Sequence, residues 1–242
     1  MSKAYERTKY VKRYCVPDQL MHWTVALGFI LLMVTGFMIF FKGPASLLTT
    51  SAGVAFRQGH RIGAILFLGA PLLYLLFSSK RLGFLIAFKW GKADFGWLKA
   101  APKHYFIGGE GMPPQEKYNT GQKMYYFVIL IFGLLLAMSG FSLWFDWFSG
   151  PLGVWMLVMH DISALIVTIF FGVHLHLTVF HARERASFNA MTTGWMEAEY
   201  AEHHHELWFD KVKYNQMITC GERRMRRMNQ NKDQNQDKTF QA

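Results

Sequence analysis

Four long apolar runs limit what this chain can fold into more than any other feature. They cover about residues 20–41, 60–77, 124–145 and 153–180 of a 242-residue sequence. A helix needs about 20 mostly apolar residues to cross the hydrocarbon core of a bilayer, and each run has about that length. The sequence therefore predicts an all-α integral membrane protein, a bundle of four transmembrane helices. A fifth apolar piece, 84–88, is too short to span and is expected at the membrane surface.

Positive charge flanks these runs and sets their orientation. A net charge of +10 would also fit a nucleic-acid binder, but the Lys and Arg residues form no binding stripe. Of the 26 basic residues, 23 lie in 1–19, 78–123 and 182–242, and three lie in connections on the other side. Cytoplasmic loops of membrane proteins are enriched in Lys and Arg. We therefore expect both termini and 78–123 in the cytoplasm, the lipid bilayer as partner and no nucleic acid.

The rest of the chain is organised around the spans. We expect residues 1–198 to form the membrane domain and 199–242 a cytoplasmic tail, whose last dozen residues are disordered because they are rich in Asn and Gln. The first apolar run is too long for a signal peptide and has no cleavage site, so it is expected to be retained. Cys15 and Cys220 both fall on the reducing side, so no disulfide is expected. No internal repeat is evident.

Histidines stand out within the spans, because an ionisable residue inside a membrane is costly and is usually functional. His160 and His174 are 14 residues apart, which puts them within about 40° of the same helix face and about 21 Å apart along the axis. His176 lies about 200° further round and cannot share that face. His22 and His60 occupy the first two spans. The remaining histidines, His104, His181 and His203 to His205, are expected to be solvated or at the headgroup level.

The direction of each span pairs these histidines by depth. The first span enters from the cytoplasm, so His22 lies near the inner surface with His174. The second enters from outside, so His60 lies near the outer surface with His160. Two such pairs suit two stacked b-type haems, because haem iron takes two axial imidazoles. The alternatives are single histidines that hydrogen-bond across helices and a metal site without haem, although zinc usually needs four ligands.

Smaller features near these histidines add detail. Gly63 and Ala64 follow His60 by one turn and Gly172 precedes His174, and small residues let a flat ring approach the backbone. His176 has two interpretations, a member of a proton relay or an interfacial residue, and the second is favoured because polar and aromatic side chains prefer that depth.

Several motifs lie at the entries to the spans and within the fourth span. They are RTKYVKRYCVPDQLMHW, GHRIGA, KYNTGQKMYYF, MHDISA and VHLHLTVFHA, with the triplet HHH before ELWF. Through these motifs, most of residues 7–205 resembles the γ subunit of respiratory formate dehydrogenase, a four-helix dihaem cytochrome b that reduces menaquinone. YNxGQK before the third span is the most specific motif. The connection 78–118 departs from the family pattern, and its role, like that of His176, stays open.

The resemblance implies the same pairing of haem ligands that the depths of the histidines in the spans indicate. His60 and His160 would hold the iron of an outer haem b, and His22 and His174 that of an inner haem b.

The resemblance also implies a quinone pocket beside the inner haem. Its polar contacts would come from Asn119, Gly121 and Gln122, and from His174 itself. The Asn119 amide can donate a hydrogen bond to a quinone carbonyl, and Gly121 allows close approach to the backbone. The alternative for Asn119 is an ordinary helix N-cap.

These implications define an electron-transfer and quinone-reducing subunit in the bacterial inner membrane. Electrons would come from a periplasmic iron–sulfur β subunit and pass through two b haems to menaquinone or ubiquinone on the cytoplasmic side. The formate chemistry would belong to a molybdenum or tungsten α subunit, since no cysteine cluster here could hold an iron–sulfur centre. The alternatives are a dihaem cytochrome b of a hydrogenase or thiosulfate-type reductase, and a haem-free transporter whose histidines relay protons.

Overall fold

The computed structural model of the chain describes residues 10–41, 50–78, 83–108, 111–181 and 184–212. They form two compact units. The helical unit contains Lys12–Gly91 and Thr120–Met196. The described residues of Lys92–Asn119 and those from Glu197 on, with the first residues of the chain, belong to the second unit. The last dozen residues, which are expected to be disordered, lie outside the described residues, and so does Cys220.

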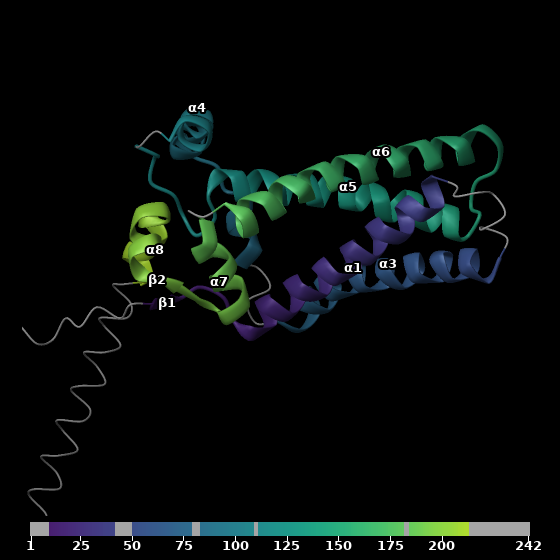
Figure 1. Cartoon of the computed structure of the whole chain (residues 1–242), viewed down its shortest axis with the longest axis horizontal. Helices are drawn as coiled ribbons and strands as arrows, with labels where there is room; N and C mark the ends of the chain where they lie inside the picture. The colour runs from purple at the N-terminus through teal and green to yellow at the C-terminus, as the bar shows by residue number, and fades with distance from the viewer. Residues whose placement is uncertain (1–9, 42–49, 79–82, 109–110, 182–183, 213–242) are drawn as a thin grey trace, which may run out of the picture. The chain divides into compact units, whose positions relative to one another are not determined.

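Long apolar helices make up most of the helical unit (Figure 1). They are α1 (Val16–Phe40), α3 (Ser51–Phe77), α5 (Thr120–Trp144) and α6 (Gly150–Leu175), the last continued by the π-helix η2 (His176–Phe180). Within the described part of the chain, these four are the helices long and apolar enough to cross a membrane. The predicted number of spans is therefore confirmed. Three of them begin three or four residues before the predicted spans, and α3 begins nine residues before.

Short elements complete the fold. The helical unit also holds the 3-10 helix η1 (Gly83–Phe88), into which the apolar piece 84–88 falls, and α7 (Arg185–Thr193). Strands β1 (Tyr10–Lys12) and β2 (Trp195–Glu197) pair in a two-stranded sheet. The second unit holds α4 (Lys92–Ile107), α8 (Ala198–His204) and a helix at 206–212. Within the described ranges the regular elements are helical apart from this pair of strands, which the sequence did not predict.

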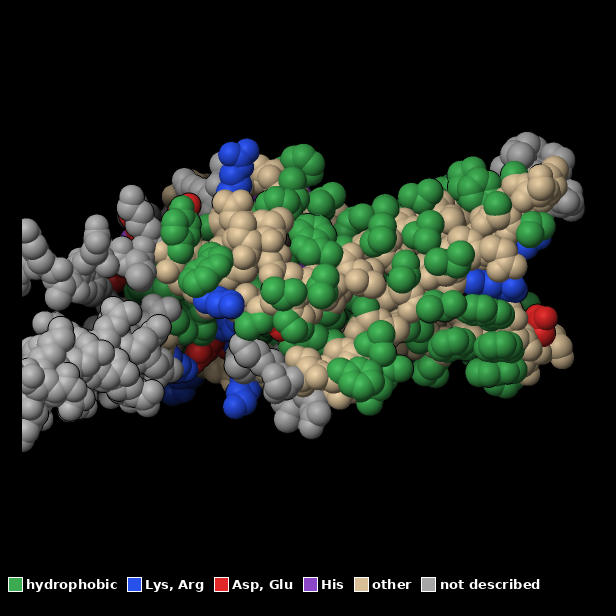
Figure 2. All heavy atoms as spheres, turned by 90° about the horizontal axis from the view of Figure 1, so that it is seen from below, with side chains coloured by type: hydrophobic (Ala, Val, Ile, Leu, Met, Phe, Trp, Pro, Cys, Tyr) green, Lys and Arg blue, Asp and Glu red, His purple; other side chains and the backbone are tan. Residues whose placement is uncertain are grey.

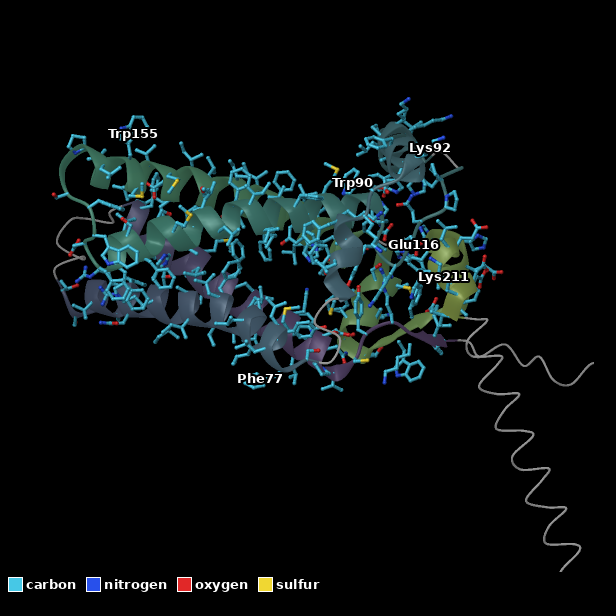
Figure 3. All side chains as sticks on the ribbon, turned by 180° about the vertical axis from the view of Figure 1, so that it is seen from behind. Phe77, Trp90, Lys92, Glu116, Trp155 and Lys211 are labelled. Carbon is cyan, nitrogen blue, oxygen red and sulfur yellow. The ribbon has the colours of Figure 1, made fainter. Side chains whose placement is uncertain are left out.

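The outer surface of the long helices is apolar. Figure 2 shows hydrophobic side chains along their middle, with no charged side chain visible there on this face. Trp155 points away from α6 and is 66 % exposed, and Phe77 at the end of α3 is 80 % exposed (Figure 3). In water such a surface would be strongly unfavourable, whereas lipid tails solvate it.

The long helices form two hairpins, α1 with α3 and α5 with α6. The backbones approach closely within each hairpin and much less between the hairpins. Gly28 of α1 and Gly63 of α3 make the first hairpin tight, because a Cβ on Gly28 would lie 2.8 Å from the backbone nitrogen of Phe67 and 3.0 Å from the Gly63 carbonyl oxygen. Small residues at such crossings are typical of helix packing in membranes.

The space between the hairpins is filled by an apolar core. Phe29 of α1, Phe67 of α3 and Val167 of α6 are its buried members. The Phe29 ring lies 6.0 Å from that of Phe67 and 4.9 Å from that of Phe171 in α6, between ring centroids. Val167 is seven residues from both His160 and His174, so the core lies at the middle depth of α6.

In the second unit, the helix at 206–212 is tied to the segment before α5. Lys211 Nζ lies 2.6 Å from a carboxylate oxygen of Glu116, and Figure 3 shows both residues. His205 is fully buried, and its Nδ1 lies 2.8 Å from the Glu116 carbonyl oxygen. The prediction that His205 is solvated is therefore wrong. A hydrogen bond to the Glu116 carbonyl, which no sequence motif signals, explains why this imidazole can leave water.

The Gly28 contact predicts a specific loss of stability. In Gly28→Leu the new side chain meets backbone atoms that cannot rotate away, so α1 and α3 must separate. We expect a destabilisation of about 1–3 kcal/mol, measured as thermal unfolding in detergent. Gly69→Leu in α3 is the matched control, since nothing lies within 4 Å of a Cβ there. Equal stabilities of the two variants would contradict the close packing.

Candidate functional site: two pairs of facing histidines

The structure brings the four candidate histidines together in two pairs, and each pair joins the two hairpins. The rings of His60 (α3) and His160 (α6) have centroids 6.2 Å apart, and those of His22 (α1) and His174 (α6) are 6.5 Å apart. The pairing that the sequence predicted from depth is the pairing found in the fold. His176 belongs to the π-helix and its side chain is exposed, which agrees with the interfacial interpretation.

Hydroxyl groups hold both rings of the His60/His160 pair. Thr35 Oγ1 lies 3.0 Å from His60 Nδ1, and Ser139 Oγ lies 3.0 Å from His160 Nδ1. With Nδ1 occupied in this way, Nε2 of each ring is the nitrogen left for another partner. Neither hydroxyl was singled out from the sequence.

Glycines lie directly beside the same two rings. A Cβ on Gly36 would be 3.2 Å from His60 Cε1, and one on Gly140 would be 3.3 Å from His160 Cε1. The sequence had pointed to other glycines. Gly63 instead packs against α1, where a Cβ would lie 3.0 Å from Leu32, and Gly172 has nothing within 4 Å.

A short correspondence between the hairpins accounts for this symmetry. Thr35-Gly36-Phe37 in α1 corresponds to Ser139-Gly140-Phe141 in α5, and HRIGA from His60 corresponds to HDISA from His160. Each hairpin thus supplies one hydroxyl, one glycine and one histidine. In each hairpin a loop separates the first matched segment from the second, and the two loops differ in length. No repeat was therefore evident until the structure placed the matched segments side by side.

The His22/His174 pair has different surroundings. His22 Nδ1 is buried and has no hydrogen-bond partner among the described residues. The Tyr125 ring from α5 stacks on His174, with centroids 4.5 Å apart and planes 9° apart. Two residues after His174 the π-helix begins, and Thr178 Oγ1 donates to the His174 carbonyl oxygen at 2.7 Å. Single π-turns of this kind are frequent at functional sites.

The residues implied for a quinone lie at the start of α5. Asn119 directly precedes the first helical residue, and Gly121 and Gln122 belong to the first turn. Gln122 Oε1 accepts a hydrogen bond from Arg13 at 3.4 Å. Because Gln122 and Tyr125 are three residues apart, they are neighbours on the helix surface, and Tyr125 reaches His174.

Two buried cations near this turn were missed by the sequence analysis. Arg13 is 4 % exposed and Lys123 is 3 % exposed, and Lys123 Nζ donates to the Lys89 carbonyl oxygen at 2.8 Å. The positive-inside pattern counted both as orientation signals. Both side chains are thus buried near the first turn of α5.

The ring separations fit a metal ion between the imidazoles of each pair. With a metal–nitrogen bond of about 2.0–2.1 Å and a ring radius of about 1.2 Å, two imidazoles on opposite sides of one metal have centroids roughly 6.4 Å apart. The observed separations are 6.2 and 6.5 Å. No group of three or more His, Cys, Asp or Glu residues in the described ranges could hold a metal ion, so two imidazoles are all that each site offers. Haem iron, whose other four ligands belong to the macrocycle, suits such a donor set.

Facing imidazoles at two depths between membrane-spanning hairpins define a membrane cytochrome of the b type. The family described as prokaryotic cytochrome b561 matches residues 13–194, which include all four histidines. The chain therefore belongs to the prokaryotic cytochrome b561 family, and the family implies haem b as its cofactor.

Several relatives match most of the chain. A formate dehydrogenase cytochrome b556(fdo) subunit of Escherichia coli is 23 % identical over 86 % of this chain and 96 % of its own length. The nitrate-inducible formate dehydrogenase cytochrome b556(Fdn) subunit of the same organism is 24 % identical over 88 % and 93 %. A formate dehydrogenase cytochrome b556 subunit of Haemophilus influenzae is 24 % identical over 81 % of each chain. The resemblance stated from the motifs is thus confirmed.

The glycines beside the His60/His160 pair predict a selective loss of haem. In Gly36→Val or Gly140→Val the new side chain pushes the adjacent imidazole off its position, which we expect to weaken haem binding by about 1–3 kcal/mol. Haem content and the optical spectrum of the purified protein measure this. Gly69→Val is the control, because that position has no neighbour within 4 Å. Full haem content in both variants would contradict a haem at this pair.

Proposed function

We propose that this chain is the cytochrome b subunit of a membrane-bound formate dehydrogenase. Two facing histidine pairs, whose members on α6 are 14 residues apart, carry the proposal. His22 and His174 would hold the iron of an inner haem b, and His60 and His160 that of an outer one. Relatives named as formate dehydrogenase subunits, matched along more than four-fifths of this chain, support the choice of complex.

Haem b supplies reversible one-electron storage at each pair. The protein positions the two sites and keeps water out of the path between them. The four histidines fix the two sites at different depths, with the apolar layer of Phe29 and Phe67 between them. This layer keeps water and ions out of the path, while the helix rise sets a separation of about 20 Å between the two metal positions.

The excess of Lys and Arg at both termini and in 78–123 supports an orientation with these segments in the cytoplasm. The His60/His160 pair then faces the periplasmic side of the bacterial inner membrane, where an iron–sulfur subunit delivers electrons. A molybdenum- or tungsten-containing subunit carries out formate oxidation in the same complex. This chain takes no part in that chemistry.

Quinone reduction belongs to the cytoplasmic end, beside the inner pair. Asn119 and Gln122 provide side-chain amides for the quinone carbonyls, and Gly121 leaves the backbone open to the ring. The stacking of Tyr125 on His174 supports this location, since Tyr125 lies one turn from Gln122. Menaquinone takes two electrons here and two protons from the cytoplasm, so charge is separated across the membrane without a proton pump.

Haem stoichiometry is the first test. We expect two b haems per chain, measured as the pyridine complex, and one each in His174→Ala and His60→Ala, because each substitution removes one axial ligand. His176→Ala is the matched control and should keep both. A folded wild-type protein without haem would overturn the proposal in favour of a proton-relaying transporter. A hydrogenase or thiosulfate-type reductase that co-purifies would overturn the assignment to formate dehydrogenase.

Quinone contact is tested separately. In Asn119→Ala and Gln122→Ala, loss of one hydrogen bond to the quinone should slow reoxidation of the reduced protein about tenfold at low quinone concentration. Stopped-flow spectroscopy with a soluble menaquinone analogue measures the rate. Asn189→Ala in α7 serves as the control, and both haems must be retained in all three variants. Unchanged rates in the first two would remove these residues from the quinone site.

A further inference from the structure

The two hydroxyl groups beside the outer histidines are the feature that the proposed function does not use. Thr35 Oγ1 and Ser139 Oγ each contact Nδ1 of one imidazole at 3.0 Å. Each also contacts the carbonyl oxygen four residues back, Thr35 that of Leu31 at 2.6 Å and Ser139 that of Leu135 at 2.7 Å. The two arrangements match atom for atom although they come from different hairpins.

These contacts determine where the protons lie. A carbonyl oxygen can only accept, so each hydroxyl donates its single proton to the carbonyl. With that proton donated to the carbonyl, the hydroxyl oxygen is left to accept from the imidazole, in the tautomer that carries the ring proton on Nδ1. In both rings Nε2 is left with its lone pair, the form that a metal ligand needs.

Burial makes these hydrogen bonds consequential. Thr35 is 5 % exposed and Ser139 is fully buried, so water cannot replace either hydroxyl. In such surroundings a chain of hydrogen bonds running from imidazole to hydroxyl to carbonyl is stronger than its members would be in water. The ring orientation is therefore set by the helices that carry the hydroxyls, α1 and α5, and not only by those that carry the histidines.

Building on the proposed haem ligands, we propose that Thr35 and Ser139 are positioning residues that lower the reduction potential of the outer haem. An acceptor at Nδ1 makes a ligating imidazole more basic. A more basic ligand stabilises ferric over ferrous iron, and hydrogen bonding around the ligands is one of the factors that set a haem potential.

In the inner pair, at least one histidine lacks such a hydrogen bond at Nδ1. His22 Nδ1 is buried without a hydrogen-bond partner in the described part of the chain, and the Tyr125 ring stacks on His174. The outer haem is thus made the stronger reductant of the two by its hydrogen bonds. This difference favours electron movement from the outer pair to the inner pair and opposes its return.

The test is a redox titration of the full chain with both haems bound. Thr35→Val and Ser139→Ala each remove one acceptor, and each should shift the reduction equilibrium of the outer haem about fivefold towards the ferrous form. Their effects should combine in the double variant, since the two hydroxyls act on opposite ligands. Thr35→Ser and Ser139→Thr keep the hydroxyl and should restore the wild-type potential. EPR g-values of the outer haem should change in the first two variants and not in the second two.

Ser142→Ala is the matched control. Ser142 is also buried, one turn beyond Ser139 on α5, and forms no imidazole contact in the described structure. The proposal is overturned if the potential is unchanged in both acceptor-free variants, or if Ser142→Ala shifts it equally. Loss of the outer haem from Thr35→Val, with Thr35→Ser fully loaded, supports the positioning role. A wild-type protein with fewer than two haems per chain would instead overturn the proposed function itself.

Discussion

An imidazole between membrane helices has two ring nitrogens to satisfy and no water to help. The arrangement of this protein follows from how four such rings are accommodated. Each pair joins α6 to the other hairpin, and in the His60/His160 pair the hydroxyls of Thr35 and Ser139 occupy one nitrogen of each ring. Nε2 of His60 and of His160 is the nitrogen left for another partner. The backbones approach closely within each hairpin and much less between the hairpins.

Helix α6 connects the two sites mechanically and also sets the distance between them. It carries one histidine of each pair, His160 and His174, and between them Val167, which is fully buried in the core. A shift of α6 along or around its axis would therefore alter both pairs together and disturb the contact with Phe29 at the same time. Apolar packing at the middle depth thus protects the geometry of two polar sites that have no direct contact with each other.

The sequence was a good guide wherever the physical signal was local or periodic. Apolar length gave the four spans, and helix period with depth gave the two pairs. The early start of α3 was missed because residues 51–59 include Arg57 and are too polar to count as a span, although a helix can extend past the hydrocarbon. The hydroxyls, the burial of His205 and the glycines beside the rings depend on contacts between distant segments, for which a single sequence carries no period. Even the hairpin correspondence needed the fold to place its two halves together.

The correspondence between hairpins lies at the end that holds His60 and His160, and that limit is informative. A hydroxyl, a glycine and a histidine from each hairpin make an outer site with nearly equivalent halves, suited to holding one cofactor rigidly. At the inner end the equivalence is lost, since a stacked tyrosine and a π-turn surround His174. A site that only passes electrons can be symmetric. A site that also contacts a substrate, as we propose for the His22/His174 pair, needs one side free for it, and Tyr125 and the first turn of α5 lie on one side of His174.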